Sequence, residues 1–150
     1  MTICIDTNIA VAYLRESPIV ERIDRMYSPF ASDRSVILSV VIVGELRAFG
    51  MKNAWGKARL SRLDNFINQT VVVDINIENL IDRYAAIDAY SQGRHPTLPS
   101  AFSARNMGKN DLWIAATASV LDAPLLTMDQ DFAHLDQQFL TVHYVDPKLA

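Results

Sequence analysis

Apolar and polar positions follow two different periods along this chain. Short runs of β-branched and other apolar residues are typical of strands, and the segments between them place apolar side chains every three or four positions, as amphipathic helices do. The predicted strands cover residues 2–6, 36–38, 71–75, 124–127 and 141–145. One predicted helix begins after Ser17, and the others cover residues 40–50, 55–69, 77–91 and 111–121. Strands that alternate with helices indicate one α/β domain over residues 1–150, built on a parallel sheet.

Local signals mark the beginning of two helices and the position of one loop. Ser17 precedes Pro18, a pair typical of an N-cap and the first helical residue. Ser39 stands before the next helical pattern and is expected to cap it. Residues 92–109 contain two prolines and two glycines and show no period, so we expect a loop there.

The composition is that of a globular protein. Half of the 150 residues are hydrophobic, which suffices for an ordinary core. No apolar run approaches the roughly 18 residues of a membrane span, and the start MTICIDTN lacks the basic and apolar segments of a signal peptide. Cys4 is the only cysteine, which excludes an internal disulfide and a Cys-based zinc site. We therefore expect a cytoplasmic protein with no membrane partner.

The net charge of −3 excludes a broadly basic coat protein for nucleic acids. It does not exclude a nuclease, because the acids of a metal site contribute negative charge themselves.

Four acids occupy positions that are typical of a functional site. Asp6 ends the first predicted strand, Glu45 interrupts the apolar helical run VVIVGEL, Asp111 opens a helix, and Asp129 follows the strand PLLT. Ligands bind at the carboxyl ends of parallel strands. Carboxylates that converge there repel one another unless a cation lies between them, and Mg²⁺ prefers carboxylate oxygens. One or two Mg²⁺ ions are a common device for phosphodiester hydrolysis.

Each acid also has an ordinary structural interpretation. Asp6 suits a turn after a strand, and Asp111 in a first helical turn complements the helix dipole. Glu45 can reach solvent from its helix, and Asp129 lies in an acidic turn. Their joint order along the chain is therefore more informative than any one of them.

That order resembles the PIN-domain family, and within it the VapC toxins of bacterial toxin–antitoxin pairs. The resemblance rests on Asp6-Thr7-Asn8 after the first strand, on the helical Glu45, on the block NDLWIAATA from Asn110, and on TMDQDF from Thr127. It extends from residue 2 to about residue 145. It implies a three-layer α/β/α fold with a central parallel sheet, and RNA cleavage that depends on Mg²⁺ or Mn²⁺. It also implies a homodimer and inhibition by a VapB-like antitoxin.

The resemblance assigns roles to single positions. Asp6 and Asp111 match the metal-binding aspartates of the family, and Glu45 matches the helical acid that completes the site. The fourth acid is Asp129 or Asp131, and Asp129 is favoured. Supporting polar residues are then expected at Thr7, Asn8, Asn110, Thr127 and Asp131.

Basic residues outside this motif are candidates for RNA contact. The segment from Ala89 to Asn110 contains no acid, while Arg94, Arg105 and Lys109 lie there. These side chains are expected to contact phosphates, with a solvated insertion or a surface for the dimer or antitoxin as the alternative. Arg15 and Arg47 lie near two of the candidate acids along the chain, and ion pairs are favoured over phosphate binding for both.

Other enzyme classes fit less well. A phosphoaspartyl phosphatase needs a second aspartate two residues after the first, where this chain has Asn8, and a dinucleotide-binding fold needs a GxGxxG motif that is missing. The remaining alternative to a metal-dependent endoribonuclease is a catalytically silent PIN-fold module that binds RNA or protein. Retention of all four acids favours the enzyme.

Overall fold

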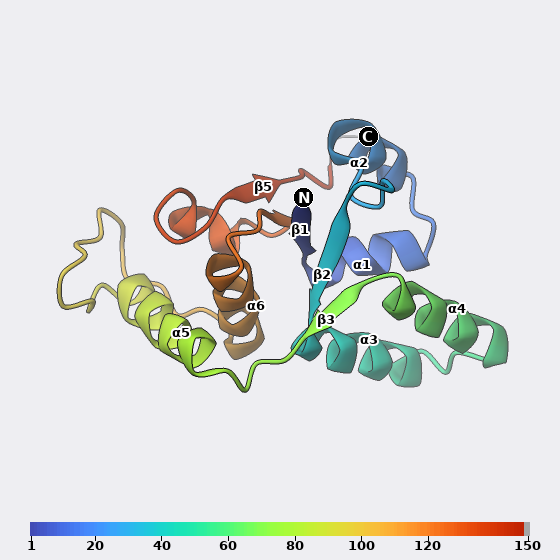
Figure 1. The fold of residues 1–150 in the computed structure, drawn as a ribbon, viewed down its shortest axis with the longest axis horizontal. Helices are drawn as coiled ribbons and strands as arrows, with labels where there is room; N and C mark the ends of the chain where they lie inside the picture. Colours follow the sequence, from blue (N-terminus) through green and yellow to red (C-terminus); the bar gives the residue numbers. More distant parts are fainter. Residues whose placement is uncertain (149–150) are drawn as a thin grey trace.

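The computed structural model describes residues 1–148 and contains a five-stranded sheet in which every neighbouring pair is parallel (Figure 1). The strands are β1 (Thr2–Ile5), β2 (Ser35–Ser39), β3 (Val71–Val73), β4 (Leu125–Thr127) and β5 (Val142–Tyr144). Their order is β3-β2-β1-β4-β5. The sheet therefore extends from β1 in two directions, and the connections reverse between β1 and β4, where open parallel sheets bind their ligands.

Helices cover the sheet on both sides. They are α1 (Thr7–Leu14), α2 (Ile19–Tyr27), α3 (Val40–Lys52), α4 (Lys57–Asn68), α5 (Glu78–Ser91) and α6 (Lys109–Val120), with a 3₁₀ helix η1 (Gln130–Leu135). Figure 1 shows α5 and α6 on one side of β1 and β2, and α1 and α4 on the other. The predicted three-layer α/β/α fold is confirmed. No helix within residues 1–148 is long and apolar enough to cross a membrane.

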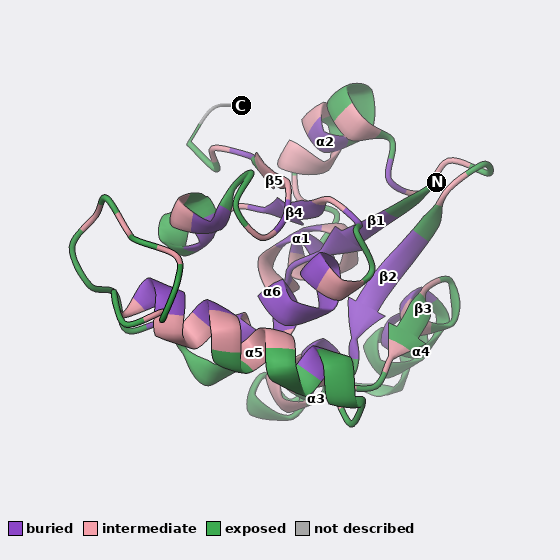
Figure 2. Ribbon diagram, turned by 60° about the vertical axis from the view of Figure 1, so that its left-hand side comes forward, coloured by how far each residue is buried: buried purple, intermediate pink, exposed green. Residues whose placement is uncertain are grey.

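The central strands lie in the core, as Figure 2 shows by their buried colour. Ile3, Cys4 and Ile5 of β1 are at most 3% exposed. Burial raises the pKa of the Cys4 thiol to about 12, so this cysteine acts as a small apolar side chain. The edge strand β3 is more open, and Val71 is 50% exposed.

The chain differs from the sequence-based expectation in three places. The helix α1, which follows Asp6 at once, was not predicted because TNIAVAYL has no clear polar face. The helix η1 was not predicted either. The expected cap at Ser17 is wrong, since α2 begins at Ile19 with Pro18 at its N-cap and no side-chain hydrogen bond there. Pro18 does have helical dihedral angles, so the difference is one residue.

Two other local predictions are confirmed. The Ser39 hydroxyl caps α3 by accepting a hydrogen bond from the Val41 N–H. Residues 92–108 connect α5 to α6 without a helix or strand, as predicted, while Lys109, the last residue of the predicted loop, already lies in α6.

Candidate metal centre

The carboxyl ends of β1 and β4 lie side by side, and both lead directly into acidic positions. Cys4 and Ile5 pair with Leu125 and Leu126. The next residue after β1 is Asp6, which is the N-cap of α1. The pairing of β1 with β4 thus brings together two segments that are about 120 residues apart in the chain.

Asp6 is the most deeply buried acid of the site, at 4% exposure. Its Oδ1 accepts a hydrogen bond from the Thr7 N–H (2.7 Å) and its Oδ2 accepts one from the Thr127 hydroxyl (2.7 Å). Burial is the main reason why the pKa of Asp6 is raised to about 6, and the charges of Asp129 and Glu45 add to the rise. The two hydrogen bonds lower this pKa and hold the carboxylate in one orientation.

Asp111 projects from the first turn of α6, which has Gly108 as its N-cap. Its pKa is raised to about 7, first by burial and then by the charges of other acids. These acids are, in order of their effect, Asp6, Asp129, Asp131 and Glu45. The raised pKa of Asp111 therefore reflects its burial first, and the charges of four nearby acids add to the rise.

The segment after β4 supplies the fourth acid. Thr127 accepts a hydrogen bond from the Asp129 N–H (2.9 Å), and Asp129 Oδ1 accepts one from the Asp131 N–H (2.9 Å). Carboxylate oxygens of Asp111, Asp129 and Asp131 all lie within 4.8 Å of one another. Asp129 is half-buried and Asp131 is exposed. Both acids thus lie beside Asp111, and Asp129 has the more enclosed position.

Glu45 reaches the site from α3. Its Oε1 accepts a hydrogen bond from the Thr7 hydroxyl (3.0 Å). Thr7 therefore contacts two acids, Asp6 through its backbone and Glu45 through its side chain. This link fixes the position of α3 relative to the start of α1.

A cavity of about 390 Å³ joins these groups. It is lined by Asp6, Thr7, Asn8, Val11, Glu45, Asp111 and Asp129. At the edge of this cavity, the Asn8 side chain accepts a hydrogen bond from the Met128 N–H (3.2 Å) and so links α1 to the segment after β4. Oxygen donors from four segments, with raised pKa values where they meet, fit a hard divalent cation such as Mg²⁺ or Mn²⁺.

Other candidates lie outside the cavity. Asn110 and Lys109 are exposed at the start of α6, and Arg94 and Arg105 belong to the connection between α5 and α6. Figure 1 shows that this connection extends beyond the end of α5. The structure therefore does not bring these basic residues into the cavity wall.

The two arginines near the acids differ from each other. Arg47 pairs with Asp64 at 3.1 Å, as expected. Arg15 has no ion pair within residues 1–148, and its guanidinium carbon lies 4.9 Å from the centre of the Phe49 ring. The ion pair expected for Arg15 is therefore wrong.

The raised pKa values predict how the metal-free protein responds to pH. Asp6 and Asp111 have folded-state pKa values of about 6 and 7 against 3.8 ordinarily, so folding favours their protonated forms. Their contribution to the free energy of unfolding is full below about pH 4 and is lost as pH rises through 6 to 7. Urea unfolding in EDTA should show this loss, and Asp111→Asn should make it smaller. An equal pH dependence in the variant would contradict the assignment.

Comparison with known proteins supports the same reading of the fold. The PIN-domain profile matches residues 3–138. No curated protein sequence matches the chain. Among solved structures, VapBC2 of Rickettsia felis, bound to a promoter DNA fragment, has a TM-score of 0.72 at 20% identity, and the match covers 96% of this chain and 98% of that chain.

A second similar structure shares a higher sequence identity with this chain than VapBC2 does. VapBC-5 of Mycobacterium tuberculosis, described as a member of the VapBC family of toxin–antitoxin systems, has a TM-score of 0.62 at 26% identity. That match covers 96% of this chain and 98% of the other. VapBC-1 of nontypeable Haemophilus influenzae shares 24% identity at a TM-score of 0.64, with 96% and 98% covered.

Proposed function

The chain belongs to the PIN-domain family, and on this basis we propose that it is a metal-dependent endoribonuclease and the toxin of a VapBC-type pair. The observation that carries the proposal is the convergence of Asp6, Glu45, Asp111 and Asp129 on one cavity at the carboxyl ends of β1 and β4. A ligand-free protein gains nothing from gathering four acids, since burial and mutual repulsion raise the pKa values of Asp6 and Asp111.

Each residue has a defined part in this proposal. Asp6, Glu45, Asp111 and Asp129 would hold Mg²⁺ or Mn²⁺, and Asp131 stands beside them. A bound cation would supply charge neutralisation at the scissile phosphate and an activated water. The hydrogen bonds from Thr127 and Thr7 oppose the rise in the pKa of Asp6 and orient its carboxylate, while Asn8 positions the chain after β4. Such supporting contacts determine how well carboxylates serve as ligands.

The partners follow from the same comparison. VapBC-5, one of the similar structures, is described as a member of a family of toxin–antitoxin systems, so we propose a VapB-like antitoxin, an RNA substrate and a cytoplasmic homodimer for this chain. Arg94, Arg105 and Lys109 are proposed to contact RNA from the acid-free segment that leads to Asp111. Exposed arginines and lysines supply the phosphate contacts of most RNA interfaces.

The test is a nuclease assay with purified protein on total RNA and on structured RNA. Cleavage should occur with Mg²⁺ or Mn²⁺, stop with EDTA and return when the metal is restored. Cleavage that survives EDTA would contradict the metal-dependent mechanism. RNA binding without cleavage under any metal would favour the alternative, a silent RNA-binding module. Retention of all four acids in one cavity is the observation against that alternative.

A further inference from the structure

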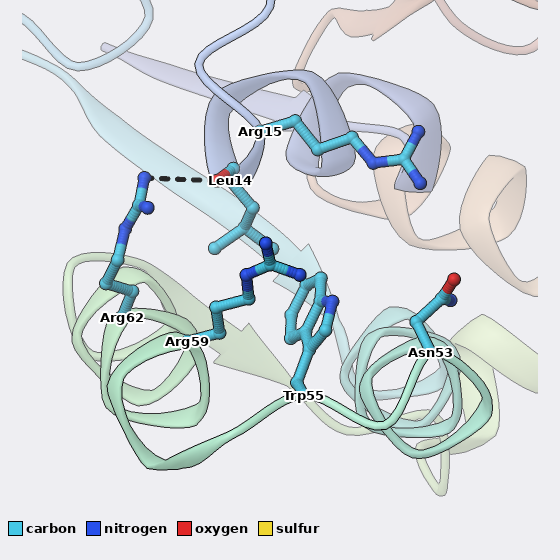
Figure 3. A pocket seen from close by; sticks show the side chains of 6 residues that line it. All are labelled: Leu14, Arg15, Asn53, Trp55, Arg59 and Arg62. Atoms are coloured by element: carbon cyan, nitrogen blue, oxygen red, sulfur yellow. Dashed lines mark hydrogen bonds between the residues drawn. The ribbon is translucent and has the colours of Figure 1, made fainter.

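A basic pocket lies at the opposite end of α1 from the metal centre (Figure 3). It has a volume of about 290 Å³ and is lined by Leu14, Arg15, Asn53, Trp55, Arg59 and Arg62. We propose that this pocket is a second subsite for single-stranded RNA, in which arginines bind a backbone phosphate and Trp55 stacks on a base. The proposal rests on the nuclease function and extends it to substrate positioning.

The pocket concentrates positive charge in a chain whose net charge is −3. Within residues 1–148, Arg15 and Arg59 have no ion pair, and only Arg62 does. That pair, to Glu16 at 2.8 Å, has side chains that are 50% and 78% exposed, so solvent screens it. Arg62 also donates to the Leu14 carbonyl (3.1 Å), the bond drawn in Figure 3. Guanidinium groups without an acid partner match the bidentate geometry of a phosphate.

Trp55 adds a flat surface to the pocket. Figure 3 shows its indole between Arg59 and Asn53. The ring is half-buried and meets Phe49 edge-on, at 5.5 Å between ring centres and 83° between planes. Asn53 donates its amide N–H to the Phe49 carbonyl (2.8 Å), which leaves its amide oxygen as an acceptor. An aromatic face beside cations and an acceptor is typical of sites for unpaired nucleotides.

Three hollows that share lining residues follow α1 from this pocket to the metal centre. The cavity at the acids shares Asn8 and Val11 with a second hollow along α1. That hollow also contains Arg15, which lines the basic pocket as well. The helix α1 has eight residues, which corresponds to about 12 Å of length. At about 3.4 Å or more per nucleotide along a strand, the two sites lie roughly two to four nucleotides apart.

An acidic peptide is the other ligand that a basic pocket attracts. Three features favour RNA over it, namely the stacking surface of Trp55, the free acceptor of Asn53 and the row of neighbouring hollows that follows α1 to the acids. A phosphodiester chain presents anionic groups and flat bases at a regular spacing, and it must also pass through the metal centre.

The experiment measures binding separately from cleavage. All variants carry Asp111→Asn, and the probe is a fluorescein-labelled single-stranded RNA of about 12 nucleotides, titrated with Mg²⁺ at several NaCl concentrations. Arg59→Ala should weaken binding about fivefold and lower the slope of log Kd against log[NaCl] by about 0.7. Arg25→Ala, an exposed arginine of α2, removes the same charge elsewhere and should change neither.

A second variant tests the stacking surface. Trp55→Leu should weaken binding about fivefold to a hundredfold without changing the salt slope, because it removes a stacking face and no charge. Thermal unfolding of this variant shows whether loss of the Phe49 contact unfolds the protein. Arg59 is exposed, so Arg59→Ala keeps the test independent of that result.

The outcomes separate the subsite from the nuclease. If the Asp111→Asn protein binds RNA but Arg59→Ala behaves as Arg25→Ala, the pocket is not an RNA subsite while the nuclease proposal stands. If Arg59→Ala keeps RNA affinity but loses affinity for labelled polyglutamate, the pocket is a protein-docking site and the proposal is wrong. If no RNA binding occurs at any salt concentration, both proposals are contradicted.

Discussion

Replacing Asp111 by asparagine should slow RNA cleavage by about a thousandfold or more. Loss of a residue that merely supports a metal ligand costs about 10–100-fold in affinity or activity, and a ligand itself should cost more. A carboxylate oxygen of Asp111 lies within 4.8 Å of carboxylate oxygens of Asp129 and Asp131, and the charges of both acids add to the effect of burial in raising its pKa. The amide has almost the same shape but carries no charge to offer a cation.

The same substitution should stabilise the metal-free protein. It removes one member of a group of acids whose charges repel each other. Thermal unfolding in EDTA at pH 8 should therefore show a higher midpoint for Asp111→Asn than for the wild type, while added Mn²⁺ should raise the midpoint of the wild type more. A variant that is inactive and also more stable cannot have lost activity through misfolding.

Asp122 provides the matched control. It is an exposed aspartate just after α6, at the end opposite Asp111, and its backbone φ of 51° is one that asparagine also tolerates. Asp122→Asn should leave cleavage, Mn²⁺ binding and unfolding unchanged. Equal cleavage by the Asp111 and Asp122 variants would contradict the role of Asp111 as a metal ligand.

The acids were recognisable from the sequence because each has a local signature. Asp6 directly follows an apolar strand, Asp129 lies two residues after another, and Asp111 opens a helix. Glu45 stands out because a charge interrupts an apolar run. Strand ends and helix starts are local properties, and parallel topology then gathers them at one edge of the sheet.

The contacts that orient these acids were not predictable in the same way. Thr127 was expected only as a supporting polar residue, and its bond to Asp6 spans 121 positions of the chain. That bond exists because β1 and β4 are neighbours in register. A single sequence contains no signal for the register of two strands so far apart.

The basic pocket could not be predicted from the sequence for a different reason. The sequence placed Trp55 at the start of the predicted helix 55–69, and Arg15 was expected in an ion pair. The pocket forms only because the end of α1 faces the turn between α3 and α4. Helix α1 was not predicted from the sequence. It is buried on several sides and therefore lacks the alternation of polar and apolar faces by which helices are predicted.

Thr127→Val should slow cleavage about 10–100-fold, the range for loss of a contact that supports a metal ligand. Thr127 is fully buried, donates to Asp6 Oδ2 (2.7 Å) and accepts from the Asp129 N–H (2.9 Å). Valine fills the same space but offers neither bond. Asp6 and Asp129 would therefore both lose a hydrogen bond to the same side chain, while the number of charges in the site stays the same.

The pH profile distinguishes this role from a general loss of stability. The hydrogen bond from Thr127 lowers the pKa of Asp6 below the value that burial alone would give. Its removal should raise that pKa above about 6, so the acid limb of kcat/KM should move to higher pH. At high pH, where Asp6 is ionised in both proteins, the difference in rate should be smaller.

Thr117→Val is the control for this experiment. Thr117 is also buried, and its hydroxyl donates to a backbone carbonyl, that of Trp113 within α6 (2.8 Å). Both substitutions should lower the free energy of unfolding by about 1–3 kcal/mol, but only Thr127→Val should move the acid limb. An unmoved limb in the Thr127 variant would mean that burial and the other acids alone determine when Asp6 ionises.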